Sequence, residues 1–277
     1  MRCGAAATLL TAAALASAAA PRASADPAAW VDPFVGTGAA DADIRRGGGA
    51  GATLPGAAVP FGLVQLSPET APATAAFGAG YAWADERVRG FSPTHVSGTG
   101  CAVLGDVPIL PLARAVTRPP APNALPRADH AHESAAPGRY RVVLDPGTPA
   151  AIGVDLTATT RTGRLRVRFP RGRPAMLLLD AGGSQNADDA ARVRIDPRRR
   201  EVVAQATGGR FCGRENRYRV TVVARFSRPL RAWGTWQGGA AIRAGATGAS
   251  ERRRATGGRT VPGGLPLPGN MRGLGYG

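Results

Sequence analysis

The sequence contains no lysine, only three cysteines and few aromatic residues, which make up 5% of the chain. Without lysine it cannot form a Walker-type phosphate loop, whose lysine reaches the nucleotide phosphates. No glycine-rich dinucleotide fingerprint follows a predicted strand, and no long apolar run occurs beyond the N-terminal region. A P-loop, a Rossmann-type dinucleotide site and a later membrane span are therefore not expected.

The formal net charge of +16 comes from 35 arginines against 19 acidic residues. Nucleic-acid-binding proteins concentrate such charge on one helix or stripe, often interleaved with aromatic residues. Here the arginines alternate along predicted strands and collect near the C-terminus. The abundance of alanine, glycine and proline indicates a compositional bias of the coding sequence instead. We therefore do not expect nucleic acid as a partner.

The N-terminus has the features of an export signal. Arg2 gives a small positive region, residues 5–20 form an apolar segment rich in alanine, and Ala23-Ser24-Ala25 matches a cleavage site. We interpret residues 1–25 as a signal peptide and expect a secreted, extracellular protein. A membrane anchor is the alternative, but the apolar run is short and dominated by alanine.

Cleavage at this site would leave two cysteines, Cys101 and Cys212. An oxidising exterior permits a disulfide between them. Two cysteines do not define a disulfide framework, however, and each is equally consistent with a small buried apolar residue. The sequence leaves both alternatives open.

From about residue 135 onward, apolar residues recur at every second position. In residues 164–169, Leu165, Val167 and Phe169 share one face and three arginines share the other. Residues 217–222 alternate in the same way, and residues 176–179 form a continuous apolar run, as expected for a strand covered on both faces. This pattern predicts an all-β fold, an antiparallel β-sandwich whose arginine faces lie in solvent.

The two ends of the sequence are less regular. Residues 32–111 are punctuated by glycine and proline, and we interpret this first third as loop-rich β structure at the edge of the same sandwich. Residues 26–240 are thus expected to form one domain. Beyond Gln237 no usable period remains, so residues 241–277 are expected to be a disordered C-terminal tail. A natural extension and a frameshifted or truncated end are the two explanations for this change.

The segment from residue 80 to residue 106 holds the residues best suited to ligand binding. It combines Tyr81 and Trp83 with short polar side chains, and the glycines at 98 and 100 would let a ligand approach the backbone. Sugar recognition uses aromatic faces and short polar side chains of this kind. The same residues also build cores and turns, and composition alone favours that second interpretation.

Individual residues give only weak catalytic hypotheses. His95 is a candidate base with Asp85 or Asp106 as its orienting partner. Ser97 lacks the strand–turn–helix context of a serine nucleophile. Residues 130–133 contain two histidines and an acid, but without further ligands at suitable spacing we interpret them as surface polar residues before a strand. No pair of carboxylates is nominated as a catalytic acid and base.

Several longer motifs carry a resemblance to a known family. They are DPFVGTG from Asp32, PGAAVPFGLVQLSPET from Pro55, GFSPTHVSGTGC from Gly90 and GGRFCGRENRY from Gly208. Together they resemble the start of the glycoside hydrolase family 92 α-mannosidases, over about residues 30–237. Members of that family are secreted or surface exo-α-mannosidases, inverting and calcium-dependent. They join an N-terminal β-sandwich to a larger helical (α/α)₆ domain.

The resemblance implies that this chain is the N-terminal sandwich, of the galactose-mutarotase-like supersandwich type, without the helical domain. That domain holds the family's catalytic acid, base and calcium ligands, so no catalytic or metal residue is assigned here, and calcium is expected only for the full-length enzyme. The sandwich is expected to form part of the wall of a pocket for mannose-containing glycans. The substrate-binding residues implied by the two matching loops are Phe34, Gly36, Thr37, Gly38, His95, Ser97, Gly98, Thr99, Gly100 and Cys101.

The sequence departs from the family pattern at Pro93, where the family has a histidine before the threonine. Because proline fixes φ and removes a donor, the local geometry of the pocket is expected to differ. The turn at residues 51–53 is altered as well. The resulting hypothesis is a carbohydrate-pocket domain without turnover of its own. A free-standing secreted glycan-binding module and a nonfunctional gene fragment are the alternatives.

Overall fold

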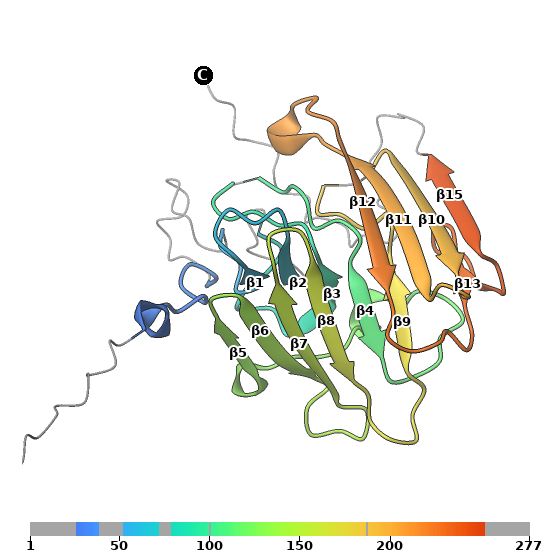
Figure 1. Ribbon diagram of the computed structural model, residues 1–277, viewed down its shortest axis with the longest axis horizontal. Coiled ribbons are helices and arrows are strands. Elements are labelled where there is room, and N and C mark those ends of the chain that lie inside the picture. Colours follow the sequence, from blue (N-terminus) through green and yellow to red (C-terminus); the bar gives the residue numbers. More distant parts are fainter. Residues whose placement is uncertain (1–25, 39–51, 72–78, 100, 187, 253–277) are drawn as a thin grey trace, which may run out of the picture.

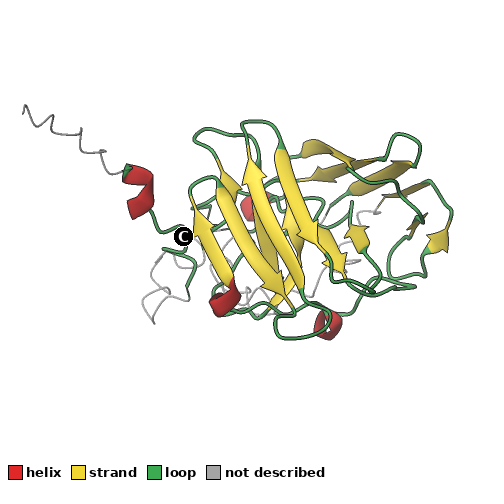
Figure 2. Ribbon diagram, turned by 60° about the horizontal axis from the view of Figure 1, so that its bottom comes forward, coloured by secondary structure: helices red, strands yellow, loops and turns green. Residues whose placement is uncertain are grey.

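The structure, a computed structural model, describes residues 26–38, 52–71, 79–99, 101–186 and 188–252. All the regular structure within these ranges is antiparallel β-sheet and short 3₁₀ turns (Figures 1 and 2). The predicted all-β antiparallel fold is therefore confirmed. The predicted signal peptide lies outside the described residues. None of the described helical turns has the length and apolar character of a membrane-crossing helix.

Two sheets pack face to face around the main core. The first contains, in spatial order, β1 (Ala57–Ala58), β2 (Gln65–Ala71), β3 (Arg87–Ser92), β4 (Ile109–Leu112) and β9 (Met176–Leu179). The second contains β5 (Glu133–Ala136), β6 (Arg139–Leu144), β7 (Ile152–Ala158) and β8 (Gly163–Arg168). Leu66 and Phe91 from the first sheet meet Tyr140, Leu144 and Leu156 from the second, all of them buried. Alternation along each strand therefore places one apolar face of each sheet in a shared core.

A third sheet lies beside this pair. It contains, in spatial order, β12 (Tyr218–Arg225), β11 (Glu201–Gly208), β10 (Ala190–Asp196) and β15 (Gly248–Arg252). β12 alternates strictly between half-buried and exposed positions, as its sequence predicts. The remaining elements are β13 (Gly234–Thr235), β14 (Arg243–Ala244), η1 (Pro27–Trp30), η3 (Pro122–Ala124), η4 (His130–His132) and η5 (Phe211–Gly213).

Two predictions about particular segments are wrong. The tail was predicted to begin at residue 241, but β14 and β15 both lie beyond it, and β15 pairs with β10 over five residues. The run at residues 176–179 was predicted to be covered on both faces. It forms β9, which ends its sheet and has one buried residue, Leu178. β9 is thus an apolar strand that the described residues cover only in part.

Candidate functional site

The two predicted loops meet on the short segment formed by Ala52 and Thr53. The amide of Gly98 donates to the Ala52 carbonyl at 2.6 Å, and the Thr53 hydroxyl donates to the Val35 carbonyl at 2.8 Å. Gly36 has a φ of +82°, and a Cβ there would lie 2.9 Å from the Thr53 side chain, so the contact requires glycine. Residues 34–38, 52–53 and 97–99 therefore form one connected surface, which we call the rim.

An aromatic cluster of Phe34, Tyr81, Trp83 and His130 lies beside the rim. The Trp83 amide donates to the carbonyl of Thr37 at 2.9 Å, which joins the two features. The Trp83 and His130 rings are stacked, with centroids 3.4 Å apart and planes 6° apart, and Phe34 meets Trp83 edge-on at 5.2 Å. Because Trp83 is 39% exposed, the cluster presents an aromatic surface to solvent beside the rim.

The buried carboxylate of Glu133 holds this cluster in place. It accepts from the hydroxyls of Tyr81 and Tyr140 at 3.0 and 2.5 Å, and from His130 Nδ1 at 2.8 Å. His130 Nε2 faces the Trp83 carbonyl at 2.8 Å. Both groups that face the imidazole are acceptors, so either ring nitrogen can donate, and these contacts hold the ring stacked on the indole. Burial and the charge of Glu133 raise the pKa of both tyrosines, so both phenols remain donors.

A second buried cluster supports the rim from the hairpin of β2 and β3. Glu69 stands at the register shift between these strands and is 2% exposed. Its carboxylate lies 2.7 Å from His95 Nε2 and 3.3 Å from Arg89 Nη2. The Glu69–His95 contact lacks the alignment of a hydrogen bond, whereas His95 Nδ1 contacts the Gln65 carbonyl oxygen at hydrogen-bonding distance, 2.9 Å. His95 is thereby fixed inside the protein, with its side chain fully buried.

The predicted partners of His95 were wrong. Asp85 accepts from the Thr70 hydroxyl at 2.7 Å, and Asp106 accepts from the hydroxyls of Thr94 and Tyr218 at 2.8 and 2.9 Å. The acid that meets His95 is Glu69, which belongs to β2. His95 is consequently a support of the rim, since no face of its ring reaches the surface.

The fully buried carboxyl group of Asp106 has a raised pKa. Burial is the largest cause and outweighs the opposing effect of the Thr94 and Tyr218 hydrogen bonds. The folded state thus binds a proton at Asp106 more readily than the unfolded state does. Stability must fall as the pH rises from the ordinary value of 3.8 through the raised pKa.

We expect this pH dependence to disappear in Asp106→Asn. Urea unfolding of both proteins from about pH 4 to pH 7 should show the variant gaining on the parent as the pH rises. Any hydrogen bond lost in the variant shifts its free energy of unfolding by the same amount at every pH. Asp129→Asn is a control of opposite sign, because the hydrogen bond from His132 lowers the pKa of Asp129. A pH-independent difference for Asp106→Asn would contradict the assignment.

A disulfide joins Cys101 to Cys212, which settles the alternatives that the sequence left open. It ties Cys101, which lies two positions after the last rim residue, to Cys212 of η5, 111 residues further along the chain. Arg210 and Cys212 in this turn both have positive φ, of 62° and 49°. The predicted loop is therefore held by a covalent link to a segment from the third sheet's side of the fold.

The other predicted residues differ in how far they reach the surface. Thr37 is buried and donates its hydroxyl to the Phe34 carbonyl, whereas Ser97 and Gly98 are exposed. Gly38 is half-buried, and the half-buried Thr99 donates to the Cys101 carbonyl. Gly100 lies outside the described residues. The structure thus brings Phe34, Gly36, Thr37, Gly38, Ser97, Gly98 and Thr99 together in the rim, with Thr37 buried within it and His95 buried beside it.

The backbone of Pro93 contacts β2 through its carbonyl, which accepts a hydrogen bond from the Gln65 amide at 3.0 Å. The donor that proline lacks is therefore not needed for pairing with β2.

Sequence reasoning missed Glu69 and misjudged Glu133. Glu69 lies within a quoted motif, but its partners come from β3 and from the loop after it. Glu133 was interpreted as a surface residue, yet its side chain is 3% exposed. Tyr81 and Tyr140 would indicate the buried position of Glu133 only if the sequence showed that both hydroxyls bond to its carboxylate. His132 does lie at the surface, as predicted, beside the exposed Asp129.

Among residues 26–252, apart from the gaps given above, no three histidine, cysteine, aspartate or glutamate side chains gather where they could hold a metal ion. No metal ligand is therefore assigned among these residues, and calcium stays an expectation for the full-length enzymes. Calcium accordingly enters none of the chemistry assigned to these residues.

Comparison with known proteins identifies the family. The profile of the glycosyl hydrolase family 92 N-terminal domain matches residues 30–261. The chain belongs to glycoside hydrolase family 92. This match extends beyond Gln237, where the motifs had been taken to end. A search of curated proteins finds no match.

Solved family 92 structures share the fold. The glycosyl hydrolase ccman5 is 28% identical with a TM-score of 0.69, and covers 81% of this chain. The α-mannosidase BT3965 from Bacteroides thetaiotaomicron is 25% identical with a TM-score of 0.68, and covers 80%. The matched regions are 29% and 30% of those two chains. The family 92 chain described here therefore spans less than a third of the length of these relatives.

Proposed function

We propose that this family 92 domain is secreted, supplies one wall of a pocket for mannose-containing glycans, and does not cleave them alone. The observation that carries the proposal is the convergence of the rim and the Trp83 surface. Glycine-lined backbone at Gly98 and the exposed Ser97 hydroxyl offer polar contacts, and the indole offers an apolar face. The similar structures named as mannosidases make mannose the expected sugar.

The carboxylates near the rim are committed to structural contacts. Glu133 accepts three hydrogen bonds, Asp106 accepts two, and Glu69 is enclosed by His95 and Arg89. Glycoside hydrolysis normally needs two carboxyl groups placed on either side of the scissile bond, roughly 5–9.5 Å apart. These buried acids do not offer that arrangement to a ligand at the rim. The proposal therefore assigns cleavage to parts of the family's longer chain.

Export fits the same proposal, because a disulfide between Cys101 and Cys212 persists in oxidising surroundings.

A free-standing glycan-binding module is the second candidate, favoured by the exposed Trp83 surface. The two candidates differ in affinity, since one wall of a pocket encloses less of a ligand than binding sites usually do. Calorimetry of the full chain with mannose and mannobiose separates them. One wall predicts binding no tighter than about 1 mM, or −4 kcal/mol, whereas a module predicts markedly tighter binding.

Trp83→Ala is expected to abolish whatever heat of mannose binding the chain shows, because it removes the exposed aromatic surface. Trp30→Ala is the matched control: Trp30 is 82% exposed on η1, which projects from the sheets (Figure 1). Equal heats from the parent and Trp83→Ala would contradict the site. Incubation with mannobiose and calcium tests the other half of the proposal, and release of mannose by this chain would overturn it.

A further inference from the structure

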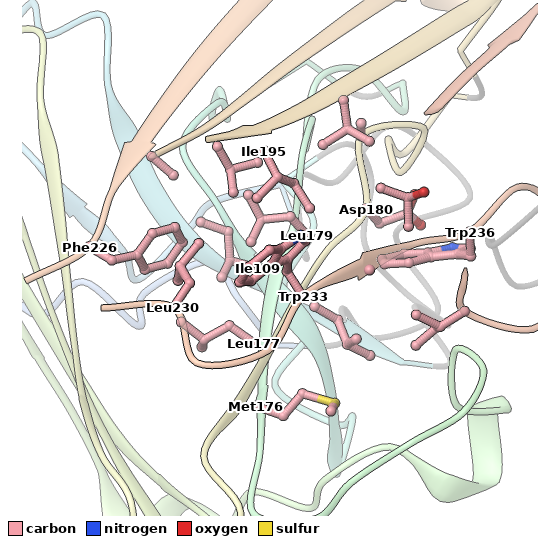
Figure 3. Close-up of a pocket in the computed structure, with 18 of the residues that line it drawn as sticks. Ile109, Met176, Leu177, Leu179, Asp180, Ile195, Phe226, Leu230, Trp233 and Trp236 are labelled. Atoms are coloured by element: carbon pink, nitrogen blue, oxygen red, sulfur yellow. The ribbon is translucent and has the colours of Figure 1, made fainter. Parts of the chain in front are cut away.

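A large apolar cleft separates the second sheet from the third. It is lined by β8 on one side, by the end of β12 on the other, and by β9 between them, with a volume of about 1880 Å³. Leu177, Leu179, Ile195 and Phe226 point into it (Figure 3). Small-molecule sites are usually about 300–1,000 Å³, so this cleft exceeds what a sugar or cofactor needs. Its size fits a segment of polypeptide.

The two strands that border the cleft are sheet edges. β8 ends the order β5-β6-β7-β8, and β12 begins the order β12-β11-β10-β15, so each has one side unpaired within the described residues. Both strands run in the same direction in Figure 1. One strand running the opposite way between them would pair antiparallel with both edges. It would join the two sheets into one and remove two exposed edges at once.

The interior of the cleft calls for apolar side chains. Val193, Ile195 and Phe226 are only half-buried although they face inward from the third sheet, and Leu179 of β9 is half-buried opposite them. The buried core on this side consists of Val107, Ala181 and Ala204, far fewer residues than the main core. An inserted strand would therefore complete the core with every second residue.

The outer face of the same gap is positively charged. β8 presents exposed arginines at positions 164, 166 and 168, and β12 presents Arg219 and Arg225. Of these, Arg225 pairs with Glu201, and no ion pair involves the other four within the described residues. Opposite charges on neighbouring strands stabilise a sheet, and like charges directly opposite destabilise it. The outward residues of an inserted strand should therefore be acidic.

The composition of the C-terminal sequence does not match such a strand. After Arg252 it contains no aspartate or glutamate, carries further arginines, and is rich in glycine and proline, which strands disfavour. A second copy would bring strands whose exposed positions are arginines, as on β8 and β12, against the arginines already there.

The geometry points to one occupant: an extended strand from polypeptide outside these 277 residues, apolar on one face and acidic on the other, inserted antiparallel between β8 and β12. This interaction surface is separate from the rim and does not depend on mannose binding. The strand's backbone gives affinity by β-augmentation, and its alternating side chains give specificity.

A synthetic peptide of alternating valine and glutamate, about eight residues long like β12, tests the inference with the full chain. We expect saturable binding by fluorescence anisotropy and slower amide exchange along β8 and β12. A peptide of the same composition with valines and glutamates in two blocks, and one alternating valine with arginine, should each bind at least about tenfold more weakly. Equal binding of either control peptide, or no change in exchange at these two strands, would overturn the proposal.

Charge reversal supplies matched variants. Arg164→Glu combined with Arg166→Glu, two exposed arginines of β8 that line the cleft, should weaken binding of the valine–glutamate peptide about tenfold. Arg194→Glu, at an exposed arginine of β10 that does not line the cleft, should leave binding unchanged. If the double variant fails to fold, a salt titration of the parent measures the same electrostatic contribution to binding. Rising salt should progressively weaken binding of the acidic peptide. Binding that is indifferent to both salt and charge reversal would contradict an acidic outer face.

Discussion

Reduction of the Cys101–Cys212 disulfide is expected to lower the free energy of unfolding by about 2–5 kcal/mol. The bond closes a loop with a sequence separation of 111 residues, and a link of that length removes much of the conformational freedom of the unfolded chain. It also holds the chain two positions after the last rim residue against η5. Urea unfolding with and without reductant measures the loss, and amide exchange at residues 97–99 reports whether the rim loosens with it.

The serine variant of both cysteines is the control for the reductant. Its unfolding curve should match that of the reduced parent and should not respond to reductant. Identical curves for the oxidised and reduced parent would show that the bond does not contribute to stability. Loss of stability without faster exchange at the rim would show that the disulfide stabilises the whole fold but does not order the rim.

The elements that the sequence predicted well are those whose partners lie close in the chain. Residues 164–169 and 217–222 alternate cleanly because each strand has one face in solvent, and they form β8 and β12. β15 was missed because Gly248–Arg252 has no apolar period. It is a strand because β10 offers a backbone edge for it, which no local pattern reveals.

The candidate site divides in the same way. Its exposed parts, the glycine-rich loops and Trp83, are visible in the sequence as a concentration of unusual residues. Its supports are not, because Glu69 meets His95 from 26 positions away, and Tyr81 meets Glu133 from 52. These contacts depend on the register of β2 with β3 and on the position of β5, which are properties of the folded sheets. A single sequence therefore indicates the exposed residues of such a site more readily than the buried residues that support them.

Gly105→Ala is expected to destabilise the fold by about 3–5 kcal/mol, the loss typical of breaking a buried ion pair. Gly105 has a φ of +71°, and a Cβ there would lie 2.3 Å from Glu69 Oε1. Glu69 cannot move aside cheaply, because His95 and Arg89 hold its carboxylate within the core. Gly147→Ala is the matched control, since Gly147 has a φ of +73° with no atom within 4 Å of the added methyl. This variant should lose only the free energy that a left-handed backbone costs a residue with a Cβ, about 1–2 kcal/mol.

A double-mutant cycle identifies the source of the larger loss. Glu69→Ala alone should cost about 3–5 kcal/mol, because it leaves the buried His95 and the half-buried Arg89 without their carboxylate. In Gly105→Ala combined with Glu69→Ala the new methyl no longer meets that carboxylate, so the double variant should lose clearly less than the two single variants added together. Urea unfolding of the four proteins measures the coupling. Additive losses would place the cost of Gly105→Ala in the backbone alone, and Glu69 would then not be the contact that requires glycine at this position.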